Sequence, residues 1–265
     1  MAIQISNFTN ETRQITQQKG KFSVLTYLRD ASVNGYNAEM QYFMDKMDVR
    51  RRQVMVNLSE QTGSVILQSG AMQWMAGDVK CSTGVQGVGD FLGKVVRSSV
   101  TKESAVKPVY SGNGIVMLEP TYKHIILQDV ASWGPQGITV EDGMFLACDN
   151  TVQHSVVARS NFSSAVAGGE GLFNLCLRGN GIAVLESNVP QSELIEISLD
   201  NSTLKIDGRY AVCWSASLQF TVERTTKTLI GSAASGEGLV NVYRGTGKVL
   251  MAPVTPTRSF AAATE

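Results

Sequence analysis

The chain has 265 residues, of which 43% are hydrophobic, enough to bury a substantial core. Lysine plus arginine and aspartate plus glutamate both number 23, so no net field attracts nucleic acid or an anionic membrane. No apolar run approaches the ~20 residues of a membrane span, and the first residues lack the charged and apolar regions of a signal peptide. We therefore expect a cytoplasmic protein whose reduced cysteines pack as small core residues, namely Cys81, Cys148, Cys176 and Cys213.

Residues 1–50 are predicted to form an N-terminal segment with a strand and a short helix. A helical spacing connects the apolar residues Tyr36, Met40, Phe43, Met44 and Met47. We favour packing of this face against the rest of the protein, and the alternative is a docking surface, because methionine adapts to irregular partners. The run Arg50-Arg51-Arg52 that follows is interpreted as a solvated or salt-bridged strand edge rather than as a phosphate site.

Residues 51–253 are predicted to form one continuous β body built from internal repeats. Glu103, Glu170 and Glu237 are 67 residues apart and open related phrases, and a fixed long period indicates a copied supersecondary unit. The copies are expected near residues 51–106, 107–173 and 174–240, followed by a closing hairpin at 241–253 and a flexible tail at 254–265. A second short helix is expected at residues 91–96.

Glycine-containing turns support the β prediction. Each copy runs into a Gly-x-Gly sequence, at residues 112–114, 179–181 and 245–247. Glycine tolerates the positive φ that tight reversals need, so we interpret all three as hairpin turns between strands. Asp142-Gly143 is a further hairpin signal, because it lies between two β-type runs.

The sequence contains few residues spaced for catalysis or metal binding. Its two histidines, His124 and His154, are far apart, and no Cys-x-x-Cys accompanies them. No serine lies in a Gly-x-Ser-x-Gly turn, and residues 87–95 match a phosphate-binding loop only partly, because Val95 replaces its magnesium-binding hydroxyl. We predict no catalytic residue, no metal and no cofactor.

Four residues remain as candidates for binding a ligand or partner. Glu103, Glu170 and Glu237 could form a carboxylate ring around a pseudo-three-fold axis, or each could end its hairpin in solvent. Trp133 lies in the loop 132–137 and could stack on a sugar or a base, although an aromatic tucked under its own loop is the favoured interpretation.

Several phrases resemble a known family. They include Gly70-Ala-Met-Gln-Trp-Met-Ala-Gly77, Leu118-Glu-Pro-Thr-Tyr-Lys-His124 and Ser235-Gly-Glu-Gly-Leu-Val240. Over residues 20 to 253 the chain is similar to the bacterial branch of the altered-inheritance-of-mitochondria family of mitochondrial biogenesis proteins. The resemblance implies an all-β double-stranded β-helix, related in shape to the tryptophan RNA-binding attenuation protein, and homo-oligomers, most simply trimers. It implies no catalytic or ligand-binding residue, because the biochemistry of the family is unassigned.

These observations favour a non-enzymatic homo-oligomeric scaffold that presents a surface to a protein partner or a membrane-associated assembly. A small-molecule or carbohydrate-binding module is the alternative. RNA binding is the least favoured function, because the charge is balanced and fold does not determine function.

Overall fold

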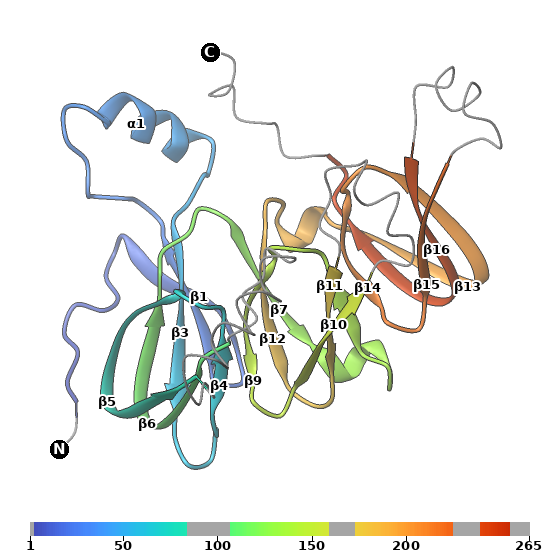
Figure 1. The fold of residues 1–265 in the computed structure, drawn as a ribbon. Helices are drawn as coiled ribbons and strands as arrows, with labels where there is room; N and C mark the ends of the chain where they lie inside the picture. The colour runs from blue at the N-terminus through green and yellow to red at the C-terminus, as the bar shows by residue number, and fades with distance from the viewer. Residues whose placement is uncertain (1–2, 84–106, 159–172, 225–238, 255–265) are drawn as a thin grey trace, which may run out of the picture.

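The computed structural model describes residues 3–83, 107–158, 173–224 and 239–254. In these ranges the chain forms two antiparallel sheets, one α-helix and two 3₁₀ helices (Figure 1). The all-β fold class is therefore confirmed, with α1 (Ala38–Lys46) as its helix. The helix predicted at residues 91–96 lies outside the described residues.

Sheet A contains most of the N-terminal half of the chain. In spatial order its strands are β1 (Arg13–Lys19), β2 (Phe22–Tyr27), β3 (Arg52–Leu58), β6 (Val109–Leu118), β4 (Val65–Leu67), β9 (Phe145–Asp149), β12 (Ile182–Ser187) and β7 (His124–Asp129), with β5 (Met72–Ser82) paired to β6. Strands β2, β4 and β9 have nearly continuous apolar sequences and are buried almost throughout, as expected of inner strands.

Sheet B contains most of the C-terminal half. Its strands are β10 (Gln153–Ala158), β11 (Phe173–Arg178), β8 (Ile138–Val140), β14 (Ala211–Ser215), β16 (Leu239–Met251) and β13 (Ile195–Asp207), with β15 (Gln219–Arg224) paired to β16. The helices η1 (Val130–Trp133) and η2 (Gln191–Glu193) are short connections. Within sheet B, Trp214 packs on Phe220 and Tyr243, with ring centroids 5.2–5.3 Å from that of the indole.

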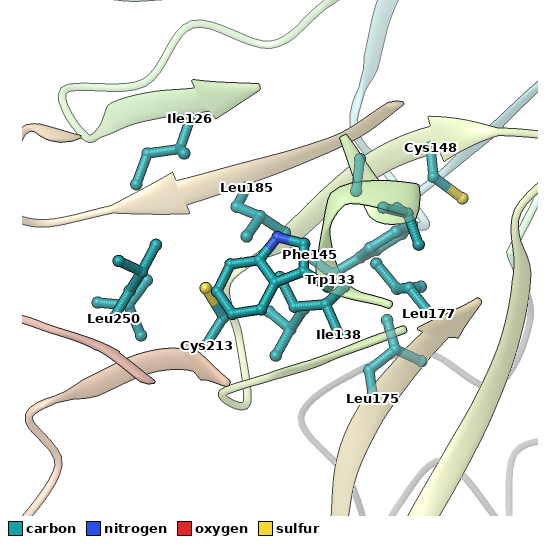
Figure 2. Packing of buried hydrophobic residues seen from close by; sticks show 14 of the residues in the cluster. Ile126, Trp133, Ile138, Phe145, Cys148, Leu175, Leu177, Leu185, Cys213 and Leu250 are labelled. Carbon is teal, nitrogen blue, oxygen red and sulfur yellow. The ribbon is translucent and has the colours of Figure 1, made fainter. Parts of the chain in front are cut away.

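The largest apolar cluster joins the two sheets. It contains Ile126, Phe145 and Leu185 from sheet A and Leu177 and Cys213 from sheet B (Figure 2). A second cluster lies within sheet A around Phe22, Val56 and Leu118. Burial of these side chains holds the β body together, at about 25 cal/mol per Å² of apolar surface removed from water.

Three pairs of strands share a pairing irregularity. Near its C-terminal end, each of β6, β12 and β16 lies opposite a one-residue bulge, in β5, β9 and β14 respectively. The residues that face the bulges, Leu118, Leu185 and Met251, are 67 and 66 residues apart. The internal repeat itself stays a prediction.

The Gly-x-Gly sequences are not hairpin turns, so that prediction was wrong. Gly112 and Gly114 lie inside β6, and residues 245–247 lie inside β16. Residues 179–181 connect β11 to β12, which belong to different sheets. The glycines serve close strand contact, because a Cβ on Gly112 would lie 2.0 Å from the Asp78 carbonyl oxygen.

The Asp142-Gly143 turn is also not a hairpin. It joins β8 to β9, and these strands belong to different sheets and do not pair with each other. Gly143 has a positive φ of 79°, so the local turn geometry was predicted and the pairing was not.

The predicted N-terminal segment contains two strands as well as the helix. Strand β2 pairs with β3, so the chain before residue 50 continues sheet A across the proposed boundary. The connection from β2 to β3 carries α1, which lies apart from both sheets in Figure 1. We call residues 28–51 the α1 arm.

Candidate functional site

The outer face of the α1 arm is a row of exposed apolar side chains. Tyr36 is fully exposed, Met40 and Phe43 are each 57% exposed, and Met47 is 76% exposed. None of the residues of α1 is buried. The favoured prediction that this face packs against the β body was therefore wrong, because the connection from β2 to β3 holds the helix away from the sheets. We call these four residues the outer stripe.

The opposite face of the arm borders a cavity of about 390 Å³. Ala38, Gln41 and Asp45 line it from the helix, and Tyr27 and Tyr122 line it from the β body. One direct contact between the helix and the body is a long hydrogen bond of 3.4 Å, which the Gln41 amide donates to the Tyr122 hydroxyl. The cavity thus separates the arm from the body instead of burying it.

Ion pairs connect segments of the arm with one another. Arg50 pairs with Asp45 and Asp48 within the arm and also donates to the Leu28 carbonyl. Arg51 lies 2.8 Å from the Asp30 carboxylate. The salt-bridged interpretation of the arginine run is therefore confirmed for Arg50 and Arg51.

Arg51 also lies against two tyrosine rings. Its guanidinium carbon is 5.3 Å from the Tyr122 ring centroid and 6.0 Å from that of Tyr27. The hydrogen bond to the Tyr122 hydroxyl, with the Asp30 charge, raises the pKa of Arg51 above its ordinary value. The guanidinium thus stays charged and connects the two ends of the arm, because Asp30 lies before α1 and Arg51 follows it.

A second candidate is a pocket in sheet A that contains a buried ion pair. The pocket has a volume of about 620 Å³ and is lined by Lys21, Thr62, Asp149 and Asn180. The Lys21 Nζ lies 3.1 Å from Asp149 Oδ1 and donates to the Ser64 carbonyl at 2.7 Å, and the two side chains are 6% and 15% exposed. Asp149 Oδ2 accepts from the Ile182 amide at 2.7 Å.

The pocket could not be found in the sequence. Lys21 and Asp149 belong to different predicted units, and neither lies in a motif. The Arg51–Tyr122 contact also joins residues far apart in the chain, and the only signal for it was the arginine run itself. Both sites depend on strand order, which single residues do not encode.

The structure places the sequence-predicted candidates elsewhere. Glu103, Glu170 and Glu237 lie outside the described residues. Trp133 is 6% exposed and belongs to the cluster between the sheets (Figure 2). Its indole nitrogen donates to Gln128 at 3.2 Å, and the Lys248 Nζ lies 4.5 Å from the ring centroid. Trp133 is therefore a core side chain and not an exposed stacking platform, because η1 turns it inward.

The cysteines are mostly core residues. Cys148, Cys176 and Cys213 are buried free thiols, whereas Cys81 is exposed, which corrects its prediction as a core residue. Burial raises the pKa of Cys148 to about 12, and burial likewise raises the pKa of Cys213. These two thiols are therefore neutral near pH 7 and pack as apolar groups.

The histidines lie on strands, as expected. Burial lowers the pKa of His124 on β7 and of His154 on β10, and nearby Arg52 and Lys107 respectively add to the effect. Within the described ranges, no three His, Cys, Asp or Glu residues are grouped to hold a metal ion.

Residues 47–254 match the model of a protein family described as mitochondrial biogenesis AIM24. The chain belongs to this family. The resemblance inferred from its phrases is thus confirmed over these residues. The helix α1 precedes the matched range, so the family match carries no information about Tyr36, Met40 and Phe43 of the outer stripe.

Two relatives show how far the similarity extends. The uncharacterized protein M6_Spy0233 of Streptococcus pyogenes serotype M6 is 32% identical over 198 residues, which are 72% of this chain and 77% of that protein. The X-ray crystal structure of protein SPYM3_0169 from Streptococcus pyogenes has a TM-score of 0.57 at 27% identity, and the match covers 78% of this chain and 89% of that chain.

In the part of the chain that the structure describes, no helix is both long enough and apolar enough to span a membrane.

Proposed function

We propose that the protein is a non-enzymatic, homo-oligomeric β scaffold in the cytoplasm that presents the α1 arm to a protein partner or a membrane-associated assembly. The observation that carries the proposal is the outer stripe, whose apolar side chains project from the body. Exposed apolar residues gathered on one helix face are typical of interaction sites. The free buried thiols support a reducing compartment.

The resemblance to the family favours a trimer, and the β body is the part of the chain that would form it. The arms would then project from a rigid centre. Multi-angle light scattering on the purified full chain measures the mass, and a mass of one subunit at every concentration would contradict the scaffold.

Partner capture tests the arm directly. Chemical cross-linking in lysate followed by mass spectrometry should recover fewer partners with a Met40→Ser/Phe43→Ser chain than with the wild type. The matched control is Val156→Ser/Val157→Ser, which removes two exposed apolar side chains from β10 instead. Flotation with liposomes, using the same variants, tests whether the α1 arm binds a membrane-associated assembly.

The pocket around Lys21 and Asp149 favours a second candidate function, a small-molecule or carbohydrate-binding module. The exposed amide of Asn180 and hydroxyl of Thr62 border a cavity with a buried charge pair at its base. Such neutral polar groups suit the hydroxyls of a sugar or polyol. In a thermal-shift screen with mono- and disaccharides, a true ligand raises the Tm of the wild type and not of Asn180→Ala.

A further inference from the structure

The outer stripe has a spacing that is the same from either end of the helix. Tyr36, Met40, Phe43 and Met47 are separated by four, three and four residues. Met40 and Phe43 lie within α1, about 60° apart at 3.6 residues per turn, and Tyr36 and Met47 flank the helix at its two ends. The face that borders the cavity lies on the opposite side of the helix. The stripe therefore points away from the body along the whole helix.

Two residues of opposite charge flank the stripe on the same side. Glu39 lies in the first turn of α1 and Lys46 in the last turn. The helical angle places both about 70–90° from the centre of the stripe, on one edge. On a second helix that runs in the opposite direction, Lys46 therefore lies near the height of Glu39 on the first helix.

We infer that the outer stripe binds the same stripe of a second copy of this chain, with the two helices antiparallel across a two-fold axis. The axis brings Tyr36 to Met47 of the second copy and Met40 to its Phe43, so every contact occurs twice. The inference rests on the proposed homo-oligomeric scaffold and identifies the partner of its arm.

Charge complementarity favours this occupant. In the antiparallel arrangement Glu39 lies about 3 Å along the axis from Lys46 of the second copy, at 1.5 Å rise per residue. The reciprocal pair forms on the same edge, because a two-fold axis between two helices keeps equivalent edges together. A parallel two-fold pair would instead place the two charged edges on opposite sides of the interface, so that neither Glu39–Lys46 pair forms.

The composition of the arm favours a protein surface over an anionic membrane. Over residues 28–51 four acids balance four bases, and α1 itself contains two acids and a single base, Lys46. Helices that lie on anionic membranes carry a polar face rich in lysine and arginine. The helix α1 lacks that basic face.

The helix also needs a cover that the body does not supply. It has nine residues, no buried residue and no side-chain hydrogen bond at its N-cap. Isolated helices shorter than about 12–15 residues are marginal in water. Contact with a second copy buries the stripe of both helices at once.

The first experiment measures mass by light scattering across a range of protein concentrations. We expect Phe43→Glu to halve the mass of the wild-type assembly, from two trimers joined by their arms to one, because it places two carboxylates beside the two-fold axis. Val157→Glu is the matched control, since it adds the same charge at another exposed apolar position, on β10, and should leave the mass unchanged. Unchanged thermal unfolding shows that both variants fold.

The second experiment exchanges the flanking charges. Glu39→Lys or Lys46→Glu alone turns both reciprocal pairs into repulsive ones, and each should weaken association about tenfold. A mixture of the two variant chains should restore wild-type association, since one chain then carries two lysines and the other two glutamates. Weakening in each single variant together with restoration in the mixture shows that the charged edges of two copies face each other, as antiparallel pairing requires.

The outcomes separate this inference from the proposed function. A mass that Phe43→Glu does not change, or a mixture that fails to restore association, overturns the pairing of arms. If the stripe variant nevertheless loses cross-linked partners, the scaffold stands and its arm binds another protein or a membrane. If the wild type is a single subunit and captures nothing, both fail.

Discussion

The α1 arm and the cluster between the two sheets contain the same kinds of side chain in opposite surroundings. Methionine, phenylalanine and tyrosine of the arm are exposed, whereas Phe145, Leu177 and Leu185 are buried between sheets. Ion pairs stabilise the arm internally, a cation–aromatic contact joins it to the body, and apolar burial holds the body. The comparison shows that apolar periodicity predicts an element and its face, but not what covers that face.

The largest expected effect is loss of a buried aromatic. Trp214→Ala removes an indole that is 1% exposed and packed on Phe220 and Tyr243, so it should lower the free energy of unfolding by about 3–5 kcal/mol. Tyr36→Ala in the arm should change it by about 0.5 kcal/mol or less, because Tyr36 is fully exposed. Urea unfolding measures both, and comparable losses would contradict the comparison.

Ion pairs should differ between the two regions in the same way. Lys21→Met leaves the Asp149 carboxylate unpaired in a largely buried position, and we expect a loss of about 3 kcal/mol. Arg50→Met leaves Asp45 and Asp48 in water, since their side chains are 49% and 81% exposed, and the loss should be about 1 kcal/mol or less. If chemical unfolding gave equal losses of free energy for the two variants, the ion pairs of the arm would contribute as much to stability as the buried pair of sheet A.

Glycines provide a smaller test. Gly112→Ala would place a Cβ 2.0 Å from the Asp78 carbonyl oxygen at a φ of 115°, and should lower the free energy of unfolding by about 2 kcal/mol. A Cβ added at Gly35 in the arm has no atom within 4 Å, so Gly35→Ala should be neutral within about 0.5 kcal/mol. If Gly112→Ala left the free energy of unfolding unchanged, β5 and β6 would be able to move apart at Gly112.

The smallest effect concerns local opening of the arm. Amides of α1 should exchange with solvent through openings of near-zero free energy, while amides of β12 should require openings close to global unfolding. If two arms pair, protection of α1 should rise with protein concentration and that of β12 should not. Hydrogen exchange measured by mass spectrometry at two concentrations checks both statements.

Much of the fold was predictable because local patterns carry it. The alternation and apolar runs indicated an all-β chain, and the spacing from Tyr36 to Met47 placed α1 within one or two residues of its observed bounds. Of the two interpretations of the arginine run, solvated or salt-bridged, the salt-bridged one holds for Arg50 and Arg51, which pair with nearby acids.

The candidate sites were less predictable. For Trp133 the favoured interpretation, an aromatic tucked under its own loop, agrees with its burial, and the alternative of a stacking platform does not, because η1 turns the side chain into the core. Lys21 and Asp149 form the buried ion pair of the second pocket, and the sequence around neither residue predicted that pair. The three glutamates chosen from the period lie outside the described residues and stay predictions.

The amino-acid sequence alone therefore determined the β class, the position of the helix and the family of the chain, because each depends on short-range periodicity or on phrases that can be read in order. Tertiary structure alone decided that the outer stripe is exposed, that Trp133 is buried and that glycines such as Gly112 lie where paired strands come close. Those outcomes depend on which strands become neighbours, and pairing partners such as β6 with β3 and β5 are chosen by packing of the whole body rather than by any local run of residues.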